Sequence, residues 1–464
     1  MFGLKLHWWI LIGIAAGFLA GIALHKIYYE PQMHEARVAV LGENYTPEQA
    51  AGKTREIQRK QDELLRGTIA GGAVDGIGRL FLNLLKMVVI PLVFTSLISG
   101  VAGLGDPKRL GRLGLRTLAW YVTTSLIAIL TGLLLVNLIR PGVGVNLPVP
   151  TGVVPIATPD SAWDVVLNMV PSNVIKSMAD FDLFPVIFFA LMFGVFALLV
   201  RPDVSSPVIA VINGVFEIMM RMTMFIIALA PIGIAALIAK LTAVSGPTVF
   251  VELIWYVLTV ALGLILHFGV TLPLMFWLFT RRNPYRVMRA MSPALLTAFS
   301  TASSSGTLPL TLERLEHGVG VRNKISSFVL PLGATINMDG TALYEIVATI
   351  FVAQVYAHAN PDFTLTFGHQ ITIVLLSLMV SIGAAGIPSA GLVMMVIIFK
   401  AVGLPLELTG LLWAVDRVLD MFRTSVNVWS DVMGAATVAH FENEIDDSVM
   451  FRGGERALEK KLVA

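Results

Sequence analysis

Hydrophobic positions along the chain gather into long apolar runs that are separated by short polar segments. A helix needs about 20 apolar residues to cross the hydrocarbon core of a bilayer. Eight runs are close to or above that length, and they lie near residues 8–28, 77–104, 115–138, 183–200, 208–240, 250–279, 323–357 and 408–440. The pattern predicts an all-α polytopic membrane protein with about eight transmembrane helices.

Two further apolar segments, near residues 287–318 and 366–402, are broken in the middle by S-S-S-G-T-L-P and G-A-A-G-I-P-S-A-G. Each is followed by a span that contains polar residues, first N-M-D-G-T at 337–341 and then D-R-V-L-D-M-F-R-T-S-V-N-V-W-S-D at 416–431. We interpret the broken segments as two re-entrant helical hairpins within inverted repeats. Secondary transporters use such repeats to build a site near the bilayer midplane.

Basic residues predict the direction of insertion, because cytoplasmic loops carry an excess of lysine and arginine. Such residues follow the second and the sixth span, at Lys108, Arg109, Arg112, Arg116, Arg281, Arg282, Arg286 and Arg289. Both loops are therefore predicted to be cytoplasmic, with the first hairpin opening inward and the second outward. The N- and C-termini are then cytoplasmic, and the polar segment 29–75 lies on the opposite side.

Composition argues against several other classes of protein. The chain of 464 residues is 56% hydrophobic and 14% charged, whereas soluble domains are about 25% charged. A net charge of +2 gives no argument for nucleic acid, and the lack of cysteine excludes disulfides and thiolate chemistry. G-K-T at 52–54 lacks the upstream glycine of a phosphate loop, so ATP-driven transport has no support. No clear cleavage site follows the first apolar run, which we interpret as a retained helix.

The polar residues of 416–431 fall on one face of a helix, since each residue turns about 100°. Arg423 is the only cation within this stripe, and Arg417 lies at its edge. An arginine can grip a carboxylate with two hydrogen bonds, and Asp420 can accept from an ammonium group. The pair fits a zwitterion with an extra acidic group. The alternative is a snorkelling face near a helix end.

The N-M-D-G-T interruption predicts a cation site. Pro331, Gly333 and Gly340 weaken the helix, so backbone carbonyls are free to hold an ion, and Asp339 supplies negative charge. The alternative is a kink whose polar groups are satisfied by neighbours. His267 stands alone in an apolar span and is interpreted as a packed side chain.

The two hairpin interruptions differ in chemistry. S-S-S-G-T-L-P at 303–309 offers hydroxyls and backbone amides that suit a carboxylate, although a plain serine-rich loop has the same composition. The glycines of G-A-A-G-I-P-S-A-G permit the tight turns of a gate, and the alternative is close packing of helices through small residues.

S-S-S-G-T-L-P, N-M-D-G-T and D-x-x-R-T-x-x-N-x-x-x-D occur in this order, and they resemble the sodium-dependent glutamate/aspartate transporter family. These dicarboxylate/amino acid:cation symporters include homologues of excitatory amino-acid transporters, and the resemblance covers nearly the whole chain outside 29–75. It implies a homotrimer in the plasma membrane, or in the inner membrane of a bacterium. A scaffold domain forms the trimer, and a transport domain of hairpins and last helices slides through the bilayer like an elevator.

The resemblance implies a site for an acidic amino acid and sites for sodium ions. Carried over by position, the substrate residues are Ser304, Ser305, Thr341, Gly386, Ile387, Asp420, Arg423, Thr424 and Asn427. A first sodium site takes Gly333, Asn337, Asn427 and Asp431. A second takes Thr335, Ser381, Ile382 and Ala384, and a third takes Tyr121, Thr124, Ser125, Asn337 and Asp339.

The resemblance also divides the chain. Residues 1–76 are the first helix and the extracytoplasmic loop, and 146–245 are scaffold and trimerisation helices. The transport domain takes 77–114, 115–145, 246–284, hairpin 1 with the broken helix at 285–365, and hairpin 2 with the last helix at 366–445. Residues 446–464 form a cytoplasmic tail.

Three positions stand out against the family pattern. Members commonly carry a second arginine directly before the serine run or directly after the aspartate of the last helix, where this chain has Ala302 and Met421. Asp420 is therefore expected to lack its usual partner. Glu345 occupies a position where animal carriers have a proton-carrying glutamate and many microbial relatives have glutamine. The alternative for Glu345 is a structural, hydrogen-bonded acid.

We therefore predict a secondary active symporter of aspartate or glutamate, coupled to sodium and potentially to a proton. Alternatives of the same class are a symporter of dicarboxylates or of neutral amino acids. An anion-conducting channel is a different class, and a buried site with paired charges argues for a carrier instead. An intramembrane hydrolase is disfavoured, because the pattern offers Ser304 no nearby base, so we predict no enzyme.

Overall fold

The computed structural model describes residues 6–43, 53–102, 110–145, 167, 170–180, 183–246, 249–360, 363–383, 390–446 and 448–449. These parts are helical and hold no β-strand, only an isolated bridge between Val321 and Ile445. The N-terminal helices are α1 (Leu6–Leu24), α2 (Glu30–Leu41), α4 (Thr54–Gly67), α5 (Ile69–Ala102), α6 (Leu115–Ile139), α8 (Val174–Ala179), α9 (Leu183–Leu199), α10 (Pro202–Ala228) and α11 (Ala230–Ser245). The C-terminal helices are α12 (Val249–Leu266), α13 (Leu272–Thr280), α14 (Pro284–Thr301), α15 (Ser304–Arg314), α16 (Asn323–Ile336), α17 (Asp339–Ala359), α18 (Phe367–Gly383), α19 (Ala390–Ala401) and α20 (Thr409–Phe441).

The predicted polytopic fold is confirmed, with local differences. By length and composition, five of the described helical stretches are able to cross a membrane alone, and shorter apolar helices accompany them. The span expected at 208–240 is divided at Leu229 between α10 and α11, where Pro231 stands in the first turn of α11 and cannot continue the hydrogen-bond ladder. A π-helical turn, η3 (His267–Thr271), joins α12 to α13 within one continuous span.

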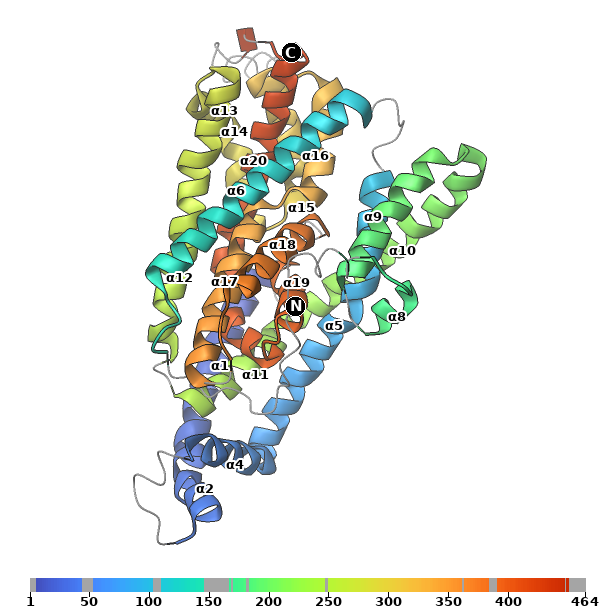
Figure 1. The fold of residues 1–464 in the computed structure, drawn as a ribbon. Helices are drawn as coiled ribbons and strands as arrows, with labels where there is room; N and C mark the ends of the chain where they lie inside the picture. The colour runs from blue at the N-terminus through green and yellow to red at the C-terminus, as the bar shows by residue number, and fades with distance from the viewer. Residues whose placement is uncertain are drawn as a thin grey trace.

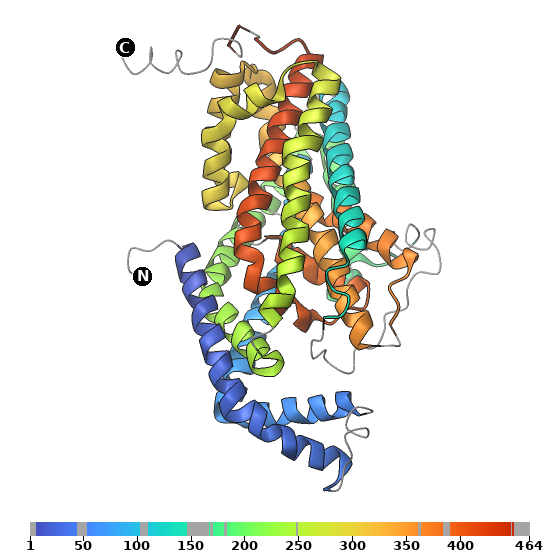
Figure 2. The same cartoon turned by 90° about the vertical axis from the view of Figure 1, so that its left-hand side faces the viewer.

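The described parts of the polar segment 29–75 are mostly helical. A π-helical turn, η1 (His25–Tyr29), carries α1 directly into α2, and α4 packs against α2. Figure 2 shows this pair at the end of the molecule opposite to residues 442–446. The assignment of 29–75 to the extracytoplasmic side remains a proposal.

Helix α1 packs on α11 through a ladder of three glycines spaced four residues apart. A Cβ atom at Gly13 would lie 2.3 Å from the carbonyl oxygen of Pro231, and one at Gly17 would lie 2.4 Å from that of Ala235. At Gly21 the nearest atom, Cβ of Thr242, would be 2.5 Å away. The two backbones therefore touch along the whole contact, which is the geometry that small residues at this spacing permit.

The helices form two groups in Figure 1. Helix α5 packs mainly against α9, α10 and α11. Helices α9 and α10 lie to one side of the bundle that contains α6, α12, α17 and α20, whereas α11 also packs against α1 and α20. Packing thus groups α5 with the segment expected to form the scaffold, although 77–114 was assigned to the transport unit. The division of the chain into a moving and a fixed part remains a proposal.

The two expected hairpins are present as helix pairs, α14 with α15 and α18 with α19. Figure 2 shows the first pair in the half of the molecule where the C-terminal residues lie, and the second pair in the other half. Helix α17 packs against α6, α12, α18, α19 and α20, and every side chain from Ala342 to Phe351 is fully buried. The broken helix is thereby at the centre of the fold.

Candidate functional site

Four charged residues of α20 form a buried ionic cluster, which we call the α20 cluster: Asp416, Arg417, Asp420 and Arg423. Arg423 Nη2 lies 2.7 Å from Asp420 Oδ1 and 3.0 Å from Asp416 Oδ1. Arg417 Nη1 lies 3.6 Å from the other oxygen of Asp420. The spacing of three and seven residues puts these side chains on one face of the helix.

Arg423 is 1% exposed and has two nitrogen atoms that remain available. Its guanidinium carbon lies 3.9 Å from the ring centroid of Tyr344, so the cation stacks on an aromatic face. Nε and Nη1 have no hydrogen-bond partner among the described residues. Buried donors of this kind cost free energy unless a ligand satisfies them, so Arg423 is suited to a carboxylate ligand.

Helix α19 approaches Arg423 at a glycine. A Cβ atom at Gly391 would lie 2.7 Å from Arg423 Nη1 and 3.1 Å from Cγ2 of Thr341. A side chain at Gly391 would therefore collide with the two predicted substrate residues. Sequence reasoning placed the second hairpin near the site through Gly386 and Ile387, which lie outside the described residues.

Asn427 joins α20 to the start of α17. Its side-chain oxygen accepts the backbone N–H of Gly340 at 2.8 Å, and its side-chain nitrogen donates to Thr341 Oγ1 at 3.2 Å. Thr424 donates to the backbone oxygen of Asp420, which is a bond within the helix. The structure thus brings the predicted residues Thr341, Asp420, Arg423, Thr424 and Asn427 together around the start of α17.

The tip of the first hairpin is a tight turn between α14 and α15. Ala302 ends α14 in the left-handed conformation, with φ of 51°, and the hydroxyl of Ser303 accepts the backbone N–H of Gly306 as an N-cap. Ser304 is buried, whereas Ser305 is exposed. Both α14 and α15 pack against α20, so the tip belongs to the same assembly as the α20 cluster.

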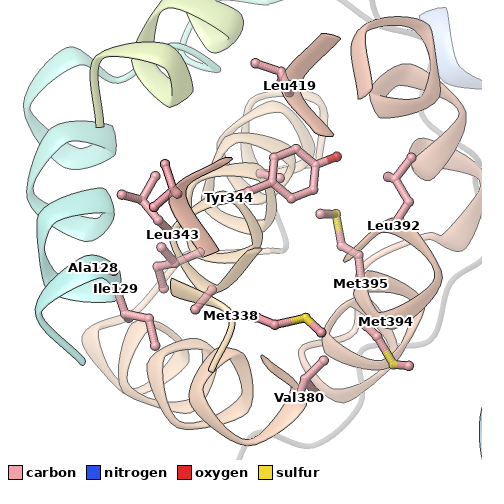
Figure 3. Close-up of a cluster of buried hydrophobic side chains, with 14 of the residues drawn as sticks. Ala128, Ile129, Met338, Leu343, Tyr344, Val380, Leu392, Met394, Met395 and Leu419 are labelled. Atoms are coloured by element: carbon pink, nitrogen blue, oxygen red, sulfur yellow. The ribbon is translucent and has the colours of Figure 1, made fainter. Parts of the chain in front are cut away.

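Apolar side chains surround the break between α16 and α17. Figure 3 shows Met338 of the break, Tyr344 of α17, and Leu392 and Met395 of α19 directed toward one another. All four are buried. This apolar wall keeps water away from the neighbouring charges, which strengthens each electrostatic contact.

The break consists of Asn337 and Met338, which have non-helical backbone angles. Asn337 donates to Asp431 Oδ1 at 2.9 Å and to Ser430 Oγ at 3.0 Å, while its own side-chain oxygen is buried with no partner among the described residues. A Cβ atom at Gly333 would lie 2.3 Å from Asp431 Oδ1, so backbone and carboxylate are close. The Gly333 carbonyl accepts the N–H of Asn337, although it was expected to lack an intrahelical partner.

These groups fit a sodium ion. Gly333, Asn337, Asn427 and Asp431 offer carbonyl, amide and carboxylate oxygens, and the unpartnered oxygen of Asn337 belongs to this set. Carbonyls at unwound parts of transmembrane helices bind sodium in secondary transporters.

Asp339 lies in a second polar group, which contains Thr124 and Ser125 from the predicted third sodium site. Its Oδ1 accepts from Ser125 at 2.6 Å and from Thr124 at 3.3 Å, and its Oδ2 accepts from Ser430 at 2.6 Å. Tyr121, expected at this site, donates to the backbone oxygen of Val329 instead.

The interpretation of His267 as a simply packed side chain is wrong. Its Nε2 lies 3.2 Å from Asp339 Oδ2, and both side chains are fully buried. The π-helical turn η3 begins at His267, so a local change of helix register accompanies this contact. The contact joins η3 to the polar group of α17, and hydrophobic periodicity does not reveal it.

The residues of the predicted second sodium site are only partly described. Thr335 donates to the backbone oxygen of Leu332, and Ser381 donates to that of Leu378. Both bonds lie within their own helices, and α16 packs against α18. Ile382 is half-buried, and Ala384 lies outside the described residues.

Asp420 was expected to lack its usual partner, an arginine at position 302 or 421, and the structure instead places Arg417 Nη1 3.6 Å from its Oδ2. Ser430 and Asp416 were not among the predicted site residues, yet both contact site residues. Their positions on the polar stripe of α20 indicated that both residues belong to the site. Both carboxyl oxygens of Glu345 are buried without a hydrogen-bond partner among the described residues, so the alternative of a hydrogen-bonded structural acid has no support there.

The protein is a helical membrane protein with a broken helix and with buried acidic and basic groups at its centre. These features are typical of secondary transporters. The sequence model of the sodium:dicarboxylate symporter family matches residues 6–441. Human excitatory amino acid transporter 2 is 36% identical over 431 residues, which cover 80% of this chain and 73% of the human protein. A Caenorhabditis elegans excitatory amino acid transporter is 35% identical over 411 residues, covering 78% of this chain and 80% of the worm protein.

Human excitatory amino acid transporter 3 is 36% identical over 414 residues, covering 78% of each chain. The chain belongs to the sodium:dicarboxylate symporter family. It is therefore a multi-pass membrane transporter and not an enzyme, and the family implies sodium as a coupled ion. The resemblance seen in the three sequence motifs is confirmed.

Proposed function

We propose that the protein carries aspartate or glutamate across the plasma membrane together with sodium. The observation that carries this proposal is Arg423, a buried cation with two unpartnered nitrogen atoms beside a pair of carboxylates. A side-chain carboxylate of the substrate satisfies those donors with two parallel hydrogen bonds. No other guanidinium of the described residues is so deeply buried.

Asp420 favours an amino acid over a plain dicarboxylate. Its carboxylate accepts an ammonium group, whereas a dicarboxylate without that group would bring a second negative charge to Asp420 and Asp416. Like charges at this depth cost several kcal/mol. The hydroxyls of Ser304, Ser305 and Thr341 then donate hydrogen bonds to the α-carboxylate.

Sodium neutralises the excess negative charge. The first ion is held by Gly333, Asn337, Asn427 and Asp431, and another by the polar group around Asp339, for which Tyr121, Thr124, Ser125 and Asn337 are candidates. A further ion is held by Thr335 with Ser381, Ile382 and Ala384. Because Asn427 is assigned to the first ion and its side chain also donates to Thr341, occupation of the ion site stabilises the substrate site.

Glu345 carries a proton in this proposal. It lies one helical turn beyond Thr341 and is fully buried. A carboxylate without partners at this depth has a desolvation cost of several kcal/mol, and a bound proton removes that cost. The carrier therefore takes up a proton during the transport cycle.

Transport follows an elevator motion of α6, the hairpins and the last helices within a homotrimer, with both termini in the cytoplasm. The separation of the helices into two groups supports the motion. The exposed apolar side chains along α10, which include Val211, Ile218 and Phe225, support contact of that helix with lipid or with another subunit.

Uptake into proteoliposomes tests the proposal. Labelled aspartate, glutamate, succinate and alanine are each offered with and without an inward sodium gradient. We expect saturable, uphill accumulation of aspartate or glutamate only with sodium. Accumulation of succinate in their place would assign the alternative dicarboxylate activity, of alanine a neutral amino-acid activity, and non-saturating downhill flux would assign a channel.

A further inference from the structure

The charges of the α20 cluster alternate along a chain of contacts. Asp416 contacts Arg423, Arg423 contacts Asp420, and Asp420 contacts Arg417. Asp420 is the inner acid of this chain, with one guanidinium on each carboxyl oxygen. Arg417 thus acts on the substrate site through Asp420.

The Arg417–Asp420 pair is buried, so its charges interact strongly with the substrate site. Arg417 is 8% exposed and Asp420 is 5% exposed, so water screens neither charge well. Two carboxylates and two guanidinium groups give the cluster a net charge of zero. Without Arg417 the remaining three groups carry a net negative charge, which repels a substrate that is itself an anion.

We propose that Arg417 is a positioning residue that holds Asp420 and balances its charge, so that the site accepts an anionic substrate. In this chain the second arginine therefore comes from the preceding turn of α20, because Ala302 and Met421 supply none at the hairpin tip or after Asp420. This inference rests on the proposed function.

Because Arg417 lies on α20, its contact with Asp420 does not depend on the position of hairpin 1. Arg417 and Asp420 belong to one helix and lie three residues apart, so their contact moves as a unit with α20. An arginine on the hairpin at position 302 would instead be displaced whenever α14 and α15 shift against α20. The charge balance of this site is thus independent of the position of hairpin 1.

The test compares aspartate with asparagine, which has nearly the same shape and lacks the side-chain charge. Both ligands present the same ammonium group and α-carboxylate, so any general disturbance of Asp420 cancels in the ratio of their inhibition constants. The ratio is measured by competition against labelled aspartate uptake in sodium-loaded proteoliposomes. The variants are Arg417→Ala, Arg417→Gln and the double variant Arg417→Ala/Met421→Arg, and the control is Arg221→Ala, which removes an exposed arginine of α10.

We expect Arg417→Ala and Arg417→Gln to lower the preference for aspartate over asparagine by about tenfold, which is a typical effect of one poorly screened charge. The double variant regains the preference, because Met421→Arg returns a cation beside Asp420. Arg221→Ala keeps the wild-type ratio. Variants with wild-type chromatographic profiles that keep the preference, or a double variant that does not regain it, overturn the inference. A wild-type protein that transports no acidic amino acid overturns the proposed function instead.

Discussion

The two ends of α20 hold ionic groups of the same chemistry in opposite surroundings. The α20 cluster is buried in the first half of the helix, where Arg423 is 1% exposed. Just beyond the other end, Glu442 pairs with Arg112 at 2.8 Å and with Arg116 at 2.6 Å, and the Arg112 side chain is 72% exposed. Distances between the paired atoms are similar, so geometry alone does not distinguish the two groups.

The difference between the two groups is the cost of desolvation. Exposed ion pairs contribute little to stability, because water and salt screen them. Buried ion pairs cost more to form, and removal of one partner leaves an uncompensated charge. The buried ionic groups in the first half of α20 therefore indicate function, whereas Glu442 connects the end of α20 to Arg112 in the π-helical turn Leu110–Gly114 and to Arg116 in the first turn of α6.

Arg423→Ala gives the largest expected effect in this comparison. It leaves Asp416 and Asp420 buried without their central cation, and we expect the affinity for aspartate to fall roughly hundredfold or more. Binding of neutral amino acids is retained better, since they do not need Arg423. Competition uptake measures both.

Arg112→Ala is the matched control for that prediction, because it removes an exposed partner of Glu442. Transport by this variant stays within about twofold of the wild type. Unchanged affinity for aspartate in Arg423→Ala would contradict the assigned role of Arg423.

Asp431→Asn tests a buried acid whose hydrogen-bond donor is an amide instead of a cation. Asn337 donates to Asp431, and the neutral variant gives less negative charge to a sodium ion at this place. We expect apparent sodium affinity to fall by about tenfold, as substitutions at metal sites commonly cause. The sodium dependence of aspartate uptake is the measurement, and an unchanged half-saturating concentration would make Asp431 structural.

Glu345→Gln tests a buried acid that has no hydrogen-bond partner among the described residues. Glutamine has the shape of the protonated acid, so exchange of internal for external substrate should persist. Net uptake should lose its dependence on pH, since the variant releases no proton. Uptake and exchange are compared over a pH series, and the same pH dependence in both proteins would remove the proton-carrier role.

Glu442→Gln gives the smallest expected effect. The hydrogen bond from Arg112, with the charges of Arg112 and Arg116, lowers the pKa of Glu442. Because the pKa is lowered on folding, these pairs stabilise the protein above the ordinary carboxyl pKa of about 4.3 and lose their effect as pH falls through the folded-state value. The variant should melt slightly below the wild type at neutral pH, and the difference should vanish in acid. Thermal unfolding in detergent at both pH values measures it.

Much of the fold is predictable because membrane helices need long apolar runs, and the polar breaks inside those runs are visible in the sequence. Helical periodicity also placed Asp420, Arg423 and Asn427 on one stripe. Burial is not predictable in this way, since α10 and α17 are both apolar, yet α10 is largely exposed and α17 is buried.

Contacts between distant segments were the part that sequence reasoning missed. His267 and Asp339 lie on different helices, and neither stretch of sequence contains a pattern that indicates a contact with the other. Arg417 was placed at the edge of the stripe by its angle, but its long side chain still reaches Asp420. The reach of a flexible side chain is a property that an angular projection of the backbone omits.

The glycine ladder of α1 has a consequence for the biogenesis of the protein. Helix α1 leaves the ribosome before its partner α11, which follows only after α10. At a synthesis rate of 5–20 residues per second, α11 is made on the order of 10–40 seconds after the glycine face of α1. During this interval the same face is open to another nascent α1. Substitution of Gly17 by a larger residue should therefore reduce the yield of assembled protein during synthesis, before any effect on the finished carrier can be observed.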